Sequence, residues 1–261
     1  APNNGLLPYT TAQGTIDTDA SLVEVRLQDL QQGATYWNEG TKTWGPAVAW
    51  NTAVIYSPGY WRVLISSTAY VNGRKYELYV KGTDSSLPAA NIGYSGTQRF
   101  WFDISKPASS VTGLTDNSTL QGLTAISGTA WDSSHYDPVG TSLQNVKITL
   151  YNTQSGQYFN GSGWGGYSEL NTGLDAGTFN GGAGRWEHNW TITPSTGWVN
   201  NYSYEVRWQA ADKAANAELN SLANPDTPRI KFTMDFQAPA AVATAPANAG
   251  VYGAGSWNIY G

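Results

Sequence analysis

The chain has 261 residues, a net charge of −5 and no cysteine, which gives room for one or two cores and excludes disulfides and thiolate zinc sites. The acidic balance argues against a nucleic-acid partner, which would need a basic face. With 12 Trp and 16 Tyr against one Met, and only 13% charged residues, the composition is typical of an all-β protein. No apolar run is long enough to span a bilayer, so no membrane insertion is expected.

The first half of the chain is predicted to be a series of short strands. Alternating apolar side chains predict strands at residues 21–27 and 61–65. Between them, Asn38 begins an Asn-Glu-Gly turn flanked by aromatic residues, which is typical of a tight hairpin. A longer strand is predicted at residues 71–84, VNGRKYELYVKGTD, and a last one at residues 100–104.

The second half repeats this series. Residues 199–212 read VNNYSYEVRWQAAD and match residues 71–84 without a gap, 128 positions further along the chain. The other elements predicted in the second copy are strands at residues 142–148, 186–192 and 232–236 and a hairpin at Asn160-Gly161. A pattern kept at fixed spacing indicates one unit used twice. About seven strands per copy, with turn signals between them, predict an antiparallel Greek-key β-sandwich.

The motifs of the second copy resemble the bacterial Ig-like repeats of large secreted and cell-surface proteins. They are Gly-Thr-Ala-x-Asp at 128–132, the strand Val146-x-Ile148, the hairpin at 158–164, and Tyr-x-Val-x-x-x-Ala-x-Asp-x-Ala-x-Asn at 204–216. The first copy matches except that it lacks the Ala-x-Asp-x-x-x-Asn ending. The resemblance implies two tandem Ig-like sandwiches in an extracellular, non-catalytic stalk, spacer, adhesin or fibre. A fold shared by so many functions does not select among these roles.

The repeat also predicts domain limits. The first sandwich is expected at residues 1–105 without its first edge strand, the second at residues 106–238, and a strand-forming tail at residues 239–261. The opening Ala-Pro-Asn-Asn, which has no initiator Met, is expected to mark a processed or excised form.

Several repeated residues are predicted to be structural. Tyr76 and Tyr204 take the place of a tyrosine corner in the resemblance. Trp61 and Trp186, at the start of equivalent strands, are predicted to fill the two cores. Glu77 and Glu205 alternate with inward residues and are expected on a solvated sheet face. Because a catalytic carboxylate pair is seldom duplicated in this way, and no nucleophile elbow or zinc motif occurs, no enzyme is expected.

The tail allows two interpretations. After Pro239 the chain resembles the segment that follows Pro107, so a third repeat begins and the chain is a piece of a longer array. Alternatively, the tail is a donor strand that completes the open edge of the first repeat in another copy, giving a head-to-tail filament. The residues predicted to make this assembly are Pro239, Val242, Val251, Tyr252, Trp257 and Ile259.

The sequence contains two sets of candidate ligand-binding residues. The first set would bind calcium as a cofactor and lies at strand-end turns near the seams between repeats, namely Asp17, Asp19, Asp132 and Asp137. Asx-turns explain the same residues without a metal.

The second set would bind surface glycans, which would make the chain a carbohydrate-binding or adhesin module. The candidate sugar-stacking residues surround the two hairpins and are Trp37, Trp44, Phe159 and Trp164. Packing beneath the hairpins is the alternative role for these rings.

Overall fold

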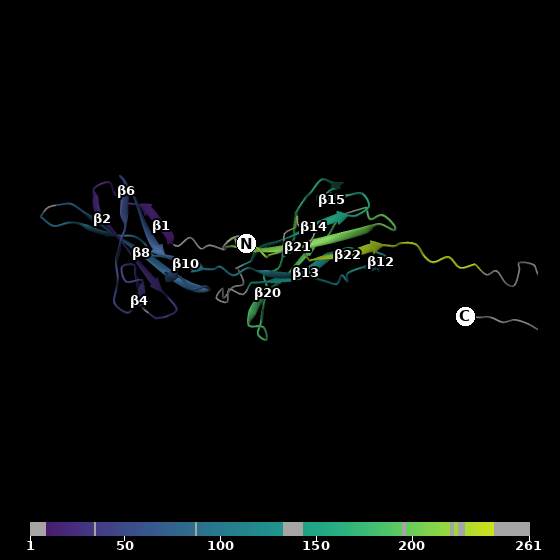
Figure 1. Cartoon of the computed structure of the whole chain (residues 1–261), viewed down its shortest axis with the longest axis horizontal. Coiled ribbons are helices and arrows are strands. Elements are labelled where there is room, and N and C mark those ends of the chain that lie inside the picture. The colour runs from purple at the N-terminus through teal and green to yellow at the C-terminus, as the bar shows by residue number, and fades with distance from the viewer. Residues whose placement is uncertain are drawn as a thin grey trace, which may run out of the picture.

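The structure is a computed structural model that describes residues 9–242, apart from residues 34, 87, 133–142, 195–196, 220–221 and 224–227. Within these residues every element is a β-strand except one 3-10 turn, η1 (Ser67–Ala69). The prediction of an all-β fold is confirmed. The strands form two pairs of sheets, which follow one another along the long axis in Figure 1.

The first pair of sheets is built from β1 to β10. The smaller sheet has the order β1 (Tyr9–Thr15), β7 (Tyr60–Ser66) and β6 (Val54–Ser57). The larger sheet has the order β10 (Gln98–Phe102), β8 (Arg74–Asp84), β2 (Ala20–Asp29), β3 (Thr35–Asn38) and β4 (Thr43–Gly45). Two short strands add to it: β5 (Asn51–Thr52) on β2 and β9 (Ile92–Tyr94) on β8. All these pairings are antiparallel.

The second pair repeats this plan. One sheet has the order β11 (Ala108–Thr112), β13 (Ile126–Trp131), β20 (Arg185–Ile192) and β18 (Gly173–Leu174), with β19 (Thr178–Asn180) on β20. The other has the order β12 (Ser118–Leu120), β22 (Arg229–Met234), β21 (Ser203–Asp212), β14 (Leu143–Asn152), β15 (Gln157–Phe159) and β16 (Trp164–Gly165), with β17 (Leu170–Asn171) on β14. Only β12 and β22 pair in parallel among the described strands. The predicted limit at residues 105–106 falls in the segment between β10 and β11.

A separate apolar core fills each sandwich. The first core takes Val25 from β2, Ile65 from β7 and Tyr76 from β8, so both sheets contribute to it. The second core takes Ile126 from β13 and Tyr204 from β21 in the same way. Alternation along the repeated strands β8 and β21 therefore puts both tyrosines inside, as their equivalent positions require.

The tyrosines share one more contact. The Tyr76 hydroxyl accepts a hydrogen bond from the backbone N–H of Val71 at 2.7 Å, and the Tyr204 hydroxyl accepts one from Val199 at 3.0 Å. Each hydroxyl is thus tied to the chain five residues upstream, which is the geometry of a tyrosine corner.

Both predicted hairpins form. In β3–β4, Trp37 pairs with Trp44, and in β15–β16, Phe159 pairs with Trp164. The Asn38 and Asn160 side chains each accept two backbone N–H bonds across the turn. Such Asx-turns replace the hydrogen bonds that the strands cannot supply at a tight bend.

The second core corrects one prediction. Trp190, not Trp186, is buried there, and its indole N–H donates to the Thr129 carbonyl as that of Trp61 donates to the Thr15 carbonyl. Trp186 is only half-buried and packs against Phe179 of β19, where β20 runs on beyond the core. The prediction matched strand starts, whereas the core residue is set by the pairing of Trp190 with Gly128 in β13.

The outward carboxylates are also not solvated as predicted. Glu77 and Glu205 do point away from the core, yet both are buried beneath arginine side chains. Arg99 Nε lies 2.9 Å from Oε2 of Glu77, and Arg229 Nε lies 3.2 Å from Oε2 of Glu205. The long arginine stems shield the carboxylates from water while their guanidinium groups neutralise them.

Candidate metal centre at the joint between the two sandwiches

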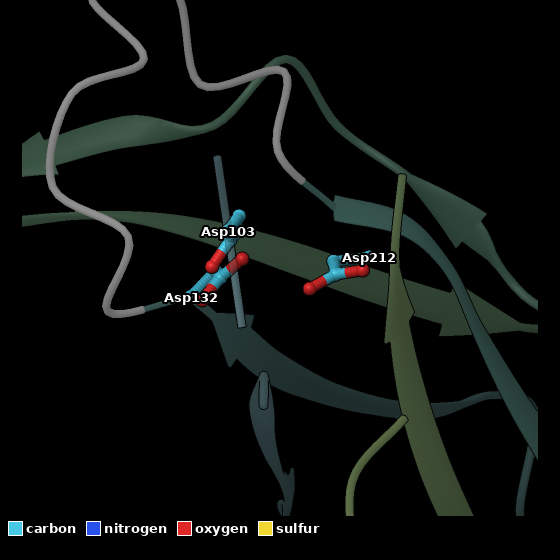
Figure 2. Close-up of side chains that lie close together, drawn as sticks. All are labelled: Asp103, Asp132 and Asp212. Carbon is cyan, nitrogen blue, oxygen red and sulfur yellow. The ribbon is translucent and has the colours of Figure 1, made fainter. Parts of the chain in front are cut away.

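Three carboxylates meet where the first sandwich passes into the second (Figure 2). Asp103, Asp132 and Asp212 each offer one oxygen, and these atoms all lie within 4.8 Å of one another. Asp103 directly follows β10, Asp132 follows β13, and Asp212 is the last residue of β21. The cluster therefore joins the exit of the first sandwich to both sheets of the second.

A turn after β21 holds Asp212 in place. The Asn216 backbone N–H donates to Oδ1 of Asp212 at 2.8 Å, and the Asn216 side-chain amide donates to Oδ2 at 2.9 Å. Ala215 adopts a positive φ of 68° in this turn. The same Asn216 amide also donates to the backbone carbonyl of Asp103 at 3.2 Å, so one side chain ties the connecting segment to the turn.

The electrostatics of the cluster follow from burial. Asp212 is fully buried and Asp132 nearly so. Burial raises the pKa of Asp212, the hydrogen bonds from Asn216 oppose this rise, and the nearby Asp103 charge adds to it. Carboxylates this close repel one another, and either a bound proton or a bound cation relieves the repulsion.

The donor set suits a hard cation. All three side chains offer oxygen, and Ca²⁺ takes six to eight oxygen ligands from carboxylates, carbonyls and water. Asp103, Asp132 and Asp212 are the residues that would hold such an ion. A cation here would neutralise the buried charge and link the two sandwiches.

Only one of the four predicted calcium ligands lies in this cluster. Asp132 is part of it. Asp17 and Asp19 instead lie in the turn after β1, at the end of the first sandwich that is far from the joint. Asp137 lies outside the described residues. The sequence patterns did not single out Asp103 and Asp212, although both lie at or next to the ends of predicted strands that flank the joint. Their convergence depends on the path of the chain from β10 into β11.

The predicted sugar-stacking residues are core residues. Trp37 and Phe159 are buried, so neither can stack on a sugar. Trp44 and Trp164 are half-buried, and their ring centroids lie 5.8 Å from Tyr76 and 5.5 Å from Tyr204. The hairpins fold their aromatic rings onto the open end of each core, which explains why they are repeated.

The predicted assembly residues are only partly described. Pro239 and Val242 follow β22 without joining a strand, and Val242 is exposed. Val251, Tyr252, Trp257 and Ile259 lie outside the described residues. No helix in the described part of the chain is long and apolar enough to cross a membrane.

The comparisons with known proteins give likenesses of shape. No family model and no curated protein matches this chain. Among solved structures, the fibronectin(III)-like modules of CbhA from Clostridium thermocellum are 13% identical, with a TM-score of 0.38 over 90% of this chain and 91% of that chain. A tetra-tandem repeat in the extending region of a large adhesion protein is 13% identical, with a TM-score of 0.30 over 88% of this chain. This chain spans 46% of that second structure.

Proposed function

We propose that the chain is a non-catalytic structural segment of an extracellular fibre, stalk or adhesin, in which Ig-like sandwiches are joined end to end. The observation that carries this proposal is the joint. Asp103 from the first sandwich meets Asp132 and Asp212 from the second, and Asn216 bonds to both sides. The end of one sandwich is thus shaped to receive the exit segment of another.

A strand edge supports head-to-tail assembly. In the second sandwich β11 pairs with β13 along residues 108–112. The strand of the first sandwich that corresponds to β13 is β1, and it pairs only with β7 among the described residues. A strand edge with free N–H and C=O groups is a template for a further strand.

Glycines at equivalent positions keep room for that strand. A Cβ on Gly128 would overlap the Ser110 carbonyl oxygen, so only glycine lets β11 approach β13. Gly14 holds the same position in β1, where the nearest atom to such a Cβ is 2.8 Å away in the Trp61 ring. In our proposal, the segment after Pro239, the counterpart of the one that forms β11, fills this edge in another copy.

The experiment compares the full chain with a chain that ends at Asp235. Analytical ultracentrifugation and negative-stain electron microscopy should show concentration-dependent polymers for the full chain and none for the shorter one. Val242→Pro should weaken assembly because proline cannot donate to a strand ladder, whereas the control Val242→Thr keeps strand propensity and should assemble normally. Strand donation is wrong if the shorter chain still polymerises.

A further inference from the structure

A row of aromatic rings lies on the outer face of the larger sheet in the first sandwich. This first ring row consists of Trp50, Tyr79 and Tyr94. The Trp50 and Tyr79 centroids are 6.2 Å apart, and those of Tyr79 and Tyr94 are 5.7 Å apart with nearly parallel planes. Tyr79 alternates along β8 with the core residue Val80, and Tyr94 pairs with Lys81, so the row faces away from the core.

Cations fix the orientation of the Trp50 and Tyr79 rings. The Arg26 guanidinium carbon lies 4.8 Å from the Tyr79 centroid and 5.7 Å from that of Trp50. Lys81 Nζ lies 4.7 Å from the centroid of the Trp50 ring and forms an ion pair with the Glu24 carboxylate. Rings held in this way lose little conformational freedom when a ligand binds. Tyr94 is 58% exposed, so part of the row is open to solvent.

The second sandwich also carries a row of aromatic rings on the outer face of its sheet. This second ring row consists of Tyr151, Tyr158 and Tyr167, with centroids 4.8 Å and 5.1 Å apart. Tyr167 is 48% exposed, and its hydroxyl donates to Glu169, which Lys147 Nζ approaches at 3.0 Å. Tyr151 and Tyr158 lie on β14 and β15, which correspond to β2 and β3, whereas Tyr79 of the first row lies on β8, which corresponds to β21. The two rows therefore occupy different strands of the same outer sheet face. Core packing explains neither row, because core side chains point to the opposite face.

Both rows combine apolar rings with balanced charge. Beside the first row, Arg26 and Lys81 face Glu24 and Glu77. Beside the second, Lys147 faces Glu169, and Arg207 Nε donates to Glu205. With cations and carboxylates matched, neither row selects a highly charged polymer.

We propose that the two ring rows bind a neutral polysaccharide laid across the outer sheet faces. The electron-rich faces of aromatic rings attract the weakly positive C–H groups on the flat side of a sugar ring. The neighbouring carboxylate, ammonium and guanidinium groups are hydrogen-bond partners for sugar hydroxyls. Two rows in one chain give avidity for a long polymer, and this inference is independent of head-to-tail assembly.

Affinity gel electrophoresis of the full chain tests the proposal, with laminarin, xyloglucan, galactomannan or hydroxyethylcellulose in the gel and alginate as the acidic comparison. At least one neutral polysaccharide should retard the chain. Tyr94→Ala and Tyr167→Ala should each weaken binding several-fold, and the double variant should weaken it by more than about tenfold. Both side chains are about half exposed, so both variants should fold. Tyr56→Ala is the control, because Tyr56 is 49% exposed but lies on β6 in the other sheet.

Two results would overturn the proposal. One is a chain that none of the four neutral polysaccharides retards. The other is binding that the double variant retains, or that Tyr56→Ala weakens as much. Retardation by alginate alone, abolished by salt, is a case of the first result, because it would show attraction of charge rather than ring stacking.

Discussion

The repeated strands β8 and β21 end in the same residue with opposite properties. Asp84 is only partly buried, and hydrogen bonds from Asn91 and Ser86 lower its pKa to about 2. Asp212 is buried, and its pKa is raised. The difference arises chiefly because burial raises the pKa of Asp212, and the nearby Asp103 charge adds to that rise, while Asp84 ends a strand away from the joint. A sequence repeat therefore conserves the strand but not the chemistry at its end.

The two sandwiches also differ at the sheet edge beside β1 and β13. β11 covers β13 in the second sandwich, whereas β1 has only β7 as a neighbour among the described strands. The second sandwich thus shows what a sandwich looks like once a preceding segment has joined it.

The largest expected effect separates Trp190 from Trp186. Trp190→Ala should destabilise the second sandwich by about 3–5 kcal/mol, because it empties the core. Trp186→Ala should cost less than about 1 kcal/mol, because that ring is half-buried at the rim. Trp61→Ala, the matched change in the first core, should resemble Trp190→Ala. Urea unfolding with hydrogen exchange resolved by sandwich measures all three, and equal losses for Trp186 and Trp190 would contradict the core assignment.

The next effect compares the glycines beneath the edge strands. Gly128→Ala should destabilise its sandwich by about 1–3 kcal/mol, because the new methyl group overlaps the β11 backbone. Gly14→Ala should cost less, because it meets only the Trp61 ring. Hydrogen exchange should show lost protection in residues 108–112 for Gly128→Ala. Unchanged protection there would show that β11 does not lie so close.

A smaller effect concerns pH and calcium at Asp212. A raised folded pKa means that the protonated carboxyl favours the native state, so this stability is present below the ordinary pKa and is lost as pH rises through the raised pKa. In chelator at pH 7, Asp212→Asn should therefore raise the melting temperature by a few degrees. Calcium should stabilise the wild type and not the variant, since it needs the carboxylate.

Asp84 is the internal control for that experiment. Its pKa is lowered, so its contribution is present above the ordinary pKa and is lost as pH falls toward about 2. Asp84→Asn should leave the response to calcium unchanged. If calcium moves the melting temperature of neither the wild type nor Asp212→Asn, the three carboxylates do not form a calcium site.

The smallest effect tests what the two sandwiches share. Tyr76→Phe and Tyr204→Phe each leave a backbone N–H without its hydroxyl partner, and each should cost about 1 kcal/mol. Because the two corners have the same geometry, the two losses should agree. Thermal unfolding by circular dichroism measures them, and a marked difference would mean that the corners are not equivalent.

Much of the fold was predictable because it is written in local patterns. Period-two alternation located the strands, and Asn-containing turns between aromatic residues located the hairpins at Asn38 and Asn160. The inward position of Tyr76 and Tyr204 follows from the same alternation. These features depend on residues within a few positions of one another, which the sequence displays directly.

The sites were decided by contacts between distant segments. Trp186 and Trp190 lie on the same side of one strand, and only the register of Trp190 against Gly128 shows which ring enters the core. The three carboxylates come from residues 103, 132 and 212, and they meet only when the path between the sandwiches is known. Alternation can tell which side chains share a face, but it cannot tell which strand, which arginine or which carboxylate will lie opposite them.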